Sequence, residues 1–148
     1  MKGESWRSAA SVYGDVSVPE YGRKAFVSDV VLFASTHKLA SPRAVADLMP
    51  YIPDSNRVFT AGDVISASAA LSVPSRTSPG VVAVDVVDES GASVYSRRAE
   101  APAECERVCG YSVSFPTEAF APGRYLVKFT VNAGKNVSVT ESSFTMRK

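Results

Sequence analysis

The stretch Tyr-Leu-Val-Lys-Phe-Thr-Val-Asn, residues 125–132, decides the fold class of this chain of 148 residues. Tyr125, Val127, Phe129 and Val131 fall on one side of an extended backbone, and the other four residues fall on the opposite side. Such alternation is typical of a strand with one buried face, because successive side chains of a strand point to opposite faces. The sequence therefore predicts a half-buried β-strand here.

The same period-two pattern recurs along the chain, in segments rich in valine, phenylalanine and tyrosine, which favour strands over helices. About eight strands are expected, near residues 12–18, 27–35, 58–60, 63–73, 81–88, 94–98, 111–116 and 124–132, with a further one near 138–146. In this last segment the apolar phase changes between Val137/Val139 and Phe144/Met146, which predicts a β-bulge.

Turn residues separate these segments, as in Asp88-Glu89-Ser90-Gly91, which predicts a hairpin loop with glycine at the position of positive φ. Only residues 42–49 have a helical pattern, with proline in the first turn. The spacing predicts an all-β, Ig-like or fibronectin-III-like antiparallel two-sheet sandwich with at most one short helix near 42–49. We expect a flexible N-terminal segment, residues 1–10, followed by a single β-sandwich domain, residues 11–148.

The charge balance argues against a nucleic-acid partner. The chain carries 16 Lys and Arg against 15 Asp and Glu, a formal net charge of +1. This balance provides no long-range field to attract a polyanion. No stretch approaches the roughly 20 apolar residues of a membrane span, so no membrane insertion is expected.

The polar start of the chain, residues 1–7, lacks the apolar core of a signal peptide. The chain is therefore expected to be cytoplasmic if Met1 is the native start. It is expected to be extracytoplasmic, periplasmic or secreted, if it is part of a longer exported chain.

The two cysteines, Cys105 and Cys109, are four residues apart. A disulfide requires Cα atoms about 4.4–6.8 Å apart, which this spacing reaches only if the segment turns tightly. A disulfide is therefore possible, and the alternative is two unpaired thiols in a loop.

Residues with catalytic or metal-binding chemistry are sparse. His37 is the single histidine, and no Gly-x-Ser-x-Gly motif accompanies it. Structural zinc needs four ligands, and Cys105, Cys109 and His37 supply three. The acidic residues within 85–89 lack the spacing of a calcium loop. We expect no enzyme activity, no catalytic, cofactor-binding or metal-binding residues, and no cofactor; a hydrolase that uses His37 with a serine or Cys105 is the weakest alternative.

Two further features leave binding functions open. Five aromatic residues are expected to lie outside the core rows, where a carbohydrate-binding module would present its stacking platform: Trp6, Tyr13, Tyr21, Tyr51 and Tyr95. The connection from Thr36 to Arg57 is long for a compact domain, and long loops often carry function. A small carbohydrate-binding module is therefore the main alternative to a protein-binding or spacer module.

Three parts of the chain resemble a known bacterial family: residues 18–32, with Val-Pro-Glu-Tyr and Phe-Val-Ser-Asp-Val-Val-Leu; residues 51–63, with Pro, Arg-Val-Phe and Gly-Asp; and Phe-Ala-Pro-Gly-Arg-Tyr at 120–125. They resemble the C-terminal Ig-like β-sandwich region of acidobacterial proteins with von Willebrand factor A-related domains, and they are similar to the tail region of bacterial GWxTD-domain proteins.

This resemblance implies a non-enzymatic interaction or spacer module at the C-terminal end of a larger exported bacterial protein. Its partner would be another protein or a neighbouring domain of the same chain. The chain lacks the von Willebrand A domain, and the segment from Asp63 to Ser68 is one residue too long for the Asp-x-Ser-x-Ser metal motif. The resemblance therefore implies neither metal-dependent adhesion nor catalytic residues.

Overall fold

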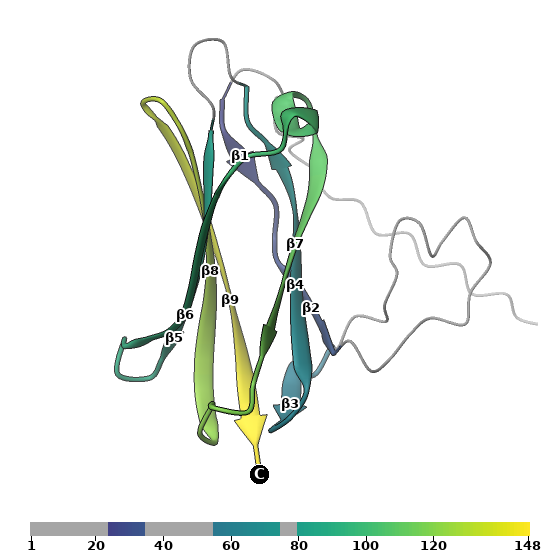
Figure 1. The fold of residues 1–148 in the computed structure, drawn as a ribbon, viewed down its shortest axis with the longest axis vertical. Helices are drawn as coiled ribbons and strands as arrows, with labels where there is room; N and C mark the ends of the chain where they lie inside the picture. Colours follow the sequence, from purple (N-terminus) through teal and green to yellow (C-terminus); the bar gives the residue numbers. More distant parts are fainter. Residues whose placement is uncertain (1–23, 35–54, 75–79) are drawn as a thin grey trace, which may run out of the picture.

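The computed structural model describes residues 24–34, 55–74 and 80–148. Within these residues, strands form two facing sheets (Figure 1). This arrangement confirms the predicted all-β sandwich. The elements are β1 (Phe26–Val27), β2 (Val31–Ala34), β3 (Val58–Thr60), β4 (Val64–Ser72), β5 (Val81–Asp88), β6 (Ser93–Glu100), the 3₁₀ turn η1 (Ala103–Glu106), β7 (Cys109–Pro116), β8 (Gly123–Ala133) and β9 (Asn136–Arg147).

The first sheet is built on β4. Strand β7 pairs antiparallel with β4 over its whole length, from Val64 opposite Pro116 to Leu71 opposite Cys109. The short strands β1 and β2 follow one another along the other side of β4. The second sheet has the order β3-β9-β8-β5-β6. The sheet on β4 is therefore three strands wide at any level among the described residues, and the facing sheet has four long strands.

The pairing of β3 with β9 is parallel, which corrects the expectation of a wholly antiparallel sandwich. The cause is the tight turn that joins β3 to β4 and fixes the direction of β3. In this turn Asp63 Oδ2 accepts hydrogen bonds from Thr60 N at 2.8 Å and from Thr60 Oγ1 at 2.9 Å. Gly62 has a φ of 95°, a conformation that glycine adopts without a steric penalty.

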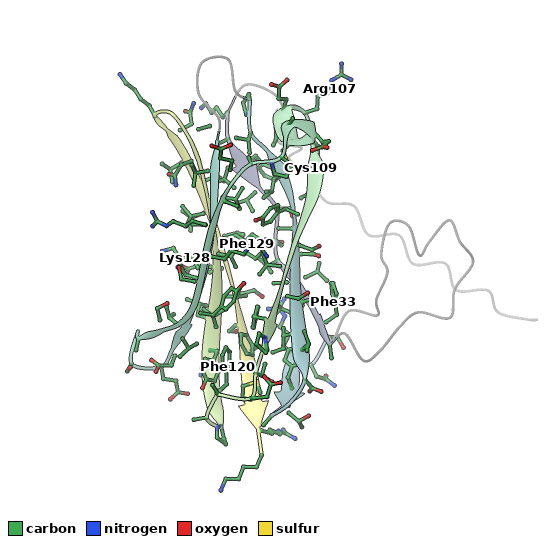
Figure 2. All side chains as sticks on the ribbon, in the orientation of Figure 1. Phe33, Arg107, Cys109, Phe120, Lys128 and Phe129 are labelled. Atoms are coloured by element: carbon green, nitrogen blue, oxygen red, sulfur yellow. A yellow bond between two sulfur atoms is a disulfide. The ribbon has the colours of Figure 1, made fainter. Side chains whose placement is uncertain are left out.

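The core between the sheets consists of the predicted alternating rows. Tyr125, Val127, Phe129 and Val131 of β8 are all 6% exposed or less. Figure 2 shows Phe129 between the sheets and its neighbour Lys128 directed away from them. Other buried row members are Ile65, Ala67, Ala69, Leu71, Val73, Val82, Val84, Val86, Val113 and Phe115.

The bulge predicted in the last strand is wrong. β8 and β9 pair without interruption from Gly123 opposite Met146 to Ala133 opposite Asn136. Val137 and Val139 are instead on the outer side of the sheet, 59% and 48% exposed. A one-residue slip would move Phe144 and Met146 out of the core, so continuous pairing that exposes two valines is the better solution.

The segment predicted as one strand at 27–35 forms two short strands with a break between them. Ser28 N donates to Ala70 O at 2.9 Å, and Ser28 Oγ accepts from Ala70 N at 2.9 Å. The serine side chain thus takes the place of a backbone acceptor, so the regular ladder of backbone hydrogen bonds is interrupted.

The turn at Ala103–Glu106 was not predicted. The segment 1–10, the strand at 12–18 and the helix at 42–49 lie outside the described residues.

Tyr125 links the turn that precedes β8 to the hydrophobic core. Its hydroxyl donates to Ala121 O at 2.8 Å, and its ring stacks on Phe120 and Phe144 with centroids 5.0 Å and 5.4 Å away. A tyrosine hydroxyl bonded to backbone a few residues upstream is the tyrosine corner of Ig-like sandwiches. Burial raises the pKa of this hydroxyl, which therefore stays protonated and able to donate.

The tyrosine corner leads to a stability prediction. Tyr125→Phe should lower the free energy of unfolding by about 1 kcal/mol, because it removes one partly buried hydrogen bond and leaves the Ala121 carbonyl without its donor. Tyr111→Phe is the control, since the Tyr111 ring packs on Phe129 and its hydroxyl has no partner in the described part of the chain. Urea unfolding of both variants measures the difference, and equal losses would contradict the prediction.

Candidate interaction surface

Several residues that the sequence indicated as candidates lie outside the described part of the chain. They are His37, Trp6, Tyr13, Tyr21, Tyr51 and most of the connection from Thr36 to Arg57. Across residues 24–34, 55–74 and 80–148, no three His, Cys, Asp or Glu side chains gather closely enough to hold a metal ion. No helix in those ranges has the length and apolar character to cross a membrane.

The acidic residues of 85–89 serve local structure. Asp88 Oδ1 accepts from Ser90 N at 2.9 Å, from Ser90 Oγ at 2.6 Å and from Ala92 N at 3.0 Å. These bonds, led by that of the Ser90 hydroxyl, lower the pKa of Asp88 below its ordinary value of 3.8. Gly91 has a φ of 82°, which confirms the predicted glycine position in this hairpin. Asp85 accepts from Ser96 Oγ at 2.6 Å across the strand pair.

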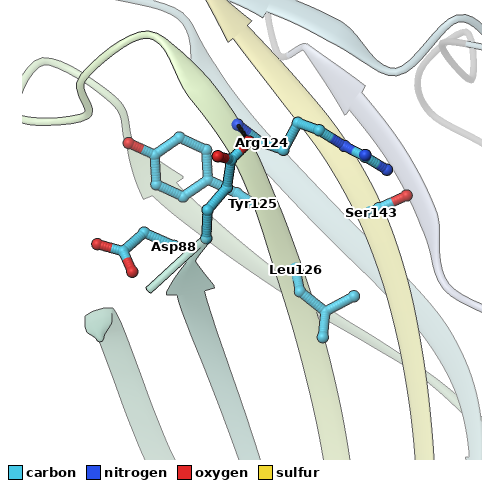
Figure 3. A pocket seen from close by; sticks show the side chains of 6 residues that line it. Asp88, Arg124, Tyr125, Leu126 and Ser143 are labelled. Atoms are coloured by element: carbon cyan, nitrogen blue, oxygen red, sulfur yellow. Dashed lines mark hydrogen bonds between the residues drawn. The ribbon is translucent and has the colours of Figure 1, made fainter. Parts of the chain in front are cut away.

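A shallow groove of about 360 Å³ opens beside this hairpin (Figure 3). Its polar groups are largely engaged already, since Asp88 holds the turn and Glu89 Oε1 accepts from Arg124 N at 3.1 Å. Tyr125 contributes to the wall but is only 6% exposed. The groove therefore follows from the packing of the hairpin and offers little to a ligand. Its lining residues are Asp88, Glu89, Arg124, Tyr125, Leu126 and Ser143.

The hydrogen bonds of Asp88 give a pH-dependent prediction. A lowered pKa means that ionised Asp88 stabilises the fold above pH 4, and that this contribution is lost as the pH falls through the lowered pKa. Asp88→Asn should therefore unfold more readily than wild type at pH 6, and the difference should narrow by pH 2. Thermal unfolding across this range measures it, and a constant difference would refute the assignment.

Cys105 and Cys109 are joined by a disulfide, with Cα atoms 4.7 Å apart. The 3₁₀ turn Ala103–Glu106 supplies the tight turn that the spacing requires. Cys105 is fully buried, and its carbonyl accepts from Val73 N at 2.7 Å. The bridge therefore joins the 3₁₀ turn to the first residue of β7, and the hydrogen bond from Val73 holds the same turn against the residue that follows β4.

The disulfide can be tested directly. Intact mass measured without reductant should equal that of a chain lacking two hydrogens, and no thiol should react with an alkylating agent. Cys109→Ser should lower the free energy of unfolding by about 2 kcal/mol, the value for closing so short a loop. Under reducing conditions wild type and variant should become nearly equal, and rapid alkylation of both cysteines in unreduced native protein would contradict the bridge.

In the part of the chain that the structure describes, the side of the sandwich formed by β6 and β7 is open. Tyr95, Arg97 and Ala99 of β6 lie opposite the buried Val86, Val84 and Val82 of β5, so they share the face that points to the core. Tyr95 and Ala99 are nevertheless only partly buried, and Arg97 is exposed. The four-stranded part of one sheet thus extends beyond the narrower sheet, and the core-facing side of β6 is incompletely covered.

One aromatic contact shows how β6 and β7 face each other. The rings of Tyr95 and Phe115 lie with centroids 5.2 Å apart. Tyr95, which was expected outside the core rows, is therefore packed against the core. Arg97 is two residues further along β6 on the same face, and its guanidinium has no ion pair within the described ranges. Among the described residues, a cation without an ionic partner thus lies beside the incompletely covered core.

The free edge of β7 completes this surface. No described strand pairs with β7 on the side away from β4, and residues 109–116 include no charged side chain. On the outer face of the sheet, Ser114 is hydrogen-bonded to Ser66 at 2.6 Å, and Ser112 is bonded to Ser68. We refer to β7 together with Tyr95, Arg97 and Ala99 as the open side.

Sequence reasoning did not identify the open side, because it depends on the relative widths of two sheets. One pattern could have indicated it. Arg97 occupies an inward position of the predicted strand 94–98, where the period-two pattern calls for an apolar residue. Arg97 and Arg98 are both exposed, but they lie on opposite faces of β6.

Comparison with known proteins supports the fold. No protein-family model and no curated protein sequence matches the chain. The C-terminal domain of Wzt is similar in structure, with a TM-score of 0.58 and 12% identity over 87% of this chain and 75% of that one. This likeness establishes a shared Ig-like β-sandwich fold and assigns no activity.

Two weaker likenesses accompany it. A β-glucuronidase from Bifidobacterium dentium gives a TM-score of 0.46 at 11% identity, over 84% of this chain but only 18% of the enzyme chain. The CARDB domain of a Pyrococcus furiosus protein gives 0.40 at 12% identity, over 83% of this chain and 94% of that one. Across the described residues, the fold is that of an Ig-like β-sandwich domain, and the side formed by β6 and β7 is open.

Proposed function

We propose that this domain is a non-enzymatic interaction module that binds another protein, or a neighbouring domain of its own chain, through the open side. The observation that carries the proposal is the incomplete burial of the core-facing side of β6, where Tyr95 and Ala99 are partly exposed and Arg97 is exposed. An incompletely covered inner face retains apolar surface that a partner can bury, at about 25 cal/mol per Å². A spacer without a partner would gain nothing from this surface.

We further propose that the domain is the C-terminal part of a larger exported bacterial protein. The resemblance to the acidobacterial β-sandwich regions supports this location. The disulfide between Cys105 and Cys109 also supports it, because disulfides persist mainly in oxidising compartments. Cell fractionation with thiols blocked at lysis tests the proposal, and native protein found in the cytoplasm with both thiols reduced would refute it.

The carbohydrate-binding alternative receives no support from the described aromatic residues. Sugar platforms need exposed, co-planar rings, and the Tyr95 ring is packed on Phe115 at an interplanar angle of 35°. The other four candidate rings lie outside the described residues. Protein binding is therefore the function that the geometry supports best.

Site-specific cross-linking in the native host tests the interaction function. A photo-reactive phenylalanine analogue at Ala99 should give one dominant adduct of discrete mass, and excess unmodified domain should compete it away. The same analogue at Val139, which is exposed on the outer face of the wider sheet, is the matched control and should give no such adduct. Identical adducts at both positions, or none at Ala99, would contradict the proposal.

A further inference from the structure

We infer that the open side binds an extended acidic segment of a partner protein, which adds as a new strand along β7 and places a carboxylate at Arg97. This inference rests on the proposed interaction function and names its partner chemistry. It has three parts: an edge that accepts a strand, a space that a strand fills, and a charge that selects which strand enters.

The edge of β7 lacks the protection that the other described edges carry. Edge strands avoid unwanted pairing by being short, by bulging, by carrying charges or by pointing a charge inward. β1 and β2 have two and four residues, and β9 is partly paired with β3. β6 has a register shift beside Val87 and carries Arg97, Arg98 and Glu100. β7 has eight regularly paired residues and no charge, so it is a suitable template for strand addition.

One strand added along β7 would cover the inner face of β6. A strand added to β7 would lie about 4.8 Å beyond it in the same sheet and about 10 Å from the facing sheet. The contact between Tyr95 and Phe115 places β6 near the edge of β7, and the exposure of Arg97 shows that β7 leaves part of the inner face of β6 uncovered. An added strand would extend the three-strand width to four and cover Tyr95 and Ala99, which are now only partly buried.

Arg97 determines the chemistry of the segment that can enter. Covering Arg97 with a neutral or basic strand would bury its guanidinium without a partner, which is strongly unfavourable. A carboxylate at the facing position forms a charge-assisted pair instead, and guanidinium and carboxylate groups pair with two parallel hydrogen bonds. The charge therefore excludes most strands and admits an acidic one.

The alternation of side chains along a strand also indicates which residue types fit the other positions of the partner segment. On the inner face, the positions on either side of the acidic residue would meet Tyr95 and Ala99, so apolar side chains fit there. On the outer face the neighbours are Ser112 and Ser114, both exposed, so small polar side chains such as threonine or serine fit best. The partner segment thus alternates small polar with apolar residues and carries Asp or Glu at the central inner position.

A second copy of this domain fits the open side poorly. Symmetric pairing of two β7 strands would bring both Arg97 side chains to one seam. Residues 109–116 provide no carboxylate to neutralise them. Like charges at a seam oppose association, so the occupant is a different polypeptide segment.

The test uses the full chain and two capped nine-residue peptides. Each alternates threonine with valine, and the central valine is replaced by glutamate in the first peptide and by lysine in the second. The glutamate peptide should bind about tenfold more tightly than the lysine peptide, a typical size for one close charge pair. NMR titration should show the shifts at Gly110, Ser112 and Ser114, with cross-strand contacts to the peptide.

Charge reversal at Arg97 and, separately, at Arg98 distinguishes a direct contact with Arg97 from an effect of net charge on peptide binding. Arg97→Glu should invert the preference in favour of the lysine peptide, and Arg97→Gln should remove it. Arg98→Glu makes the same change in net charge on the opposite face of β6 and should keep the preference for glutamate. Unfolding curves establish that each variant is folded.

Three results would overturn the inference: equal binding of both peptides, equal effects of Arg97→Glu and Arg98→Glu, or peptide shifts away from β7. A dimer in analytical ultracentrifugation with contacts at β7 would also overturn it, since the occupant would then be a second copy. If Ala99 still cross-links to a partner in the host while neither peptide binds, the interaction function stands and strand addition along β7 is wrong. If the cross-link fails too, the proposed function is wrong as well.

Discussion

The burial of one layer of alternating side chains between two sheets is the constraint on which the rest of this structure depends. Each strand can give only one face to the layer, so the positions of Val84, Phe129 and Ile65 in the core fix which face their neighbours turn outward. Register then has no freedom, because a slip of one residue exchanges the two faces. The exposed Val137 and Val139 illustrate the strength of this constraint. Two valines remain in water while Phe144 and Met146 stay buried.

The same constraint explains why an open side exists. A layer shared by two sheets is complete only where both sheets are present. Here β6 meets the facing sheet only at the edge strand β7, so its inner face is incompletely covered in the described part of the fold. Tyr95 reduces the apolar area exposed on this face by packing on Phe115. Arg97 is exposed, so its charged group stays in solvent. An arginine at this inner position keeps a charge at the edge strand of the described sheet, and in the proposed interaction that charge would select the segment that covers it.

Periodicity predicted most of the described strands, because the alternation of rows such as Val82, Val84 and Val86 is a local property of the sequence. Features that depend on distant contacts were not predictable in this way. The break between β1 and β2 depends on Ser28 meeting Ala70, 42 residues away, and the parallel pairing of β3 depends on the turn at Gly62. The possible Cys105–Cys109 bridge was visible from its spacing, but the candidate surface was not. That surface arises because the two sheets differ in width, and the sequence of a single strand does not indicate how wide its sheet is.

An overhanging edge strand is useful for recognition only if it holds its shape without a second layer, and β6 is held at both ends. At one end Asp88 fastens the hairpin through Ser90 and Ala92. At the opposite end Ala101 N donates to Gly80 O at 2.7 Å, and the Cys105–Cys109 disulfide closes the turn into β7. The strand that presents Arg97 is therefore ordered before a partner arrives, and a partner pays less entropy to bind a surface that is already in place. In the proposed interaction, the bonds that hold β6 at its two ends would therefore reduce the entropy lost on binding.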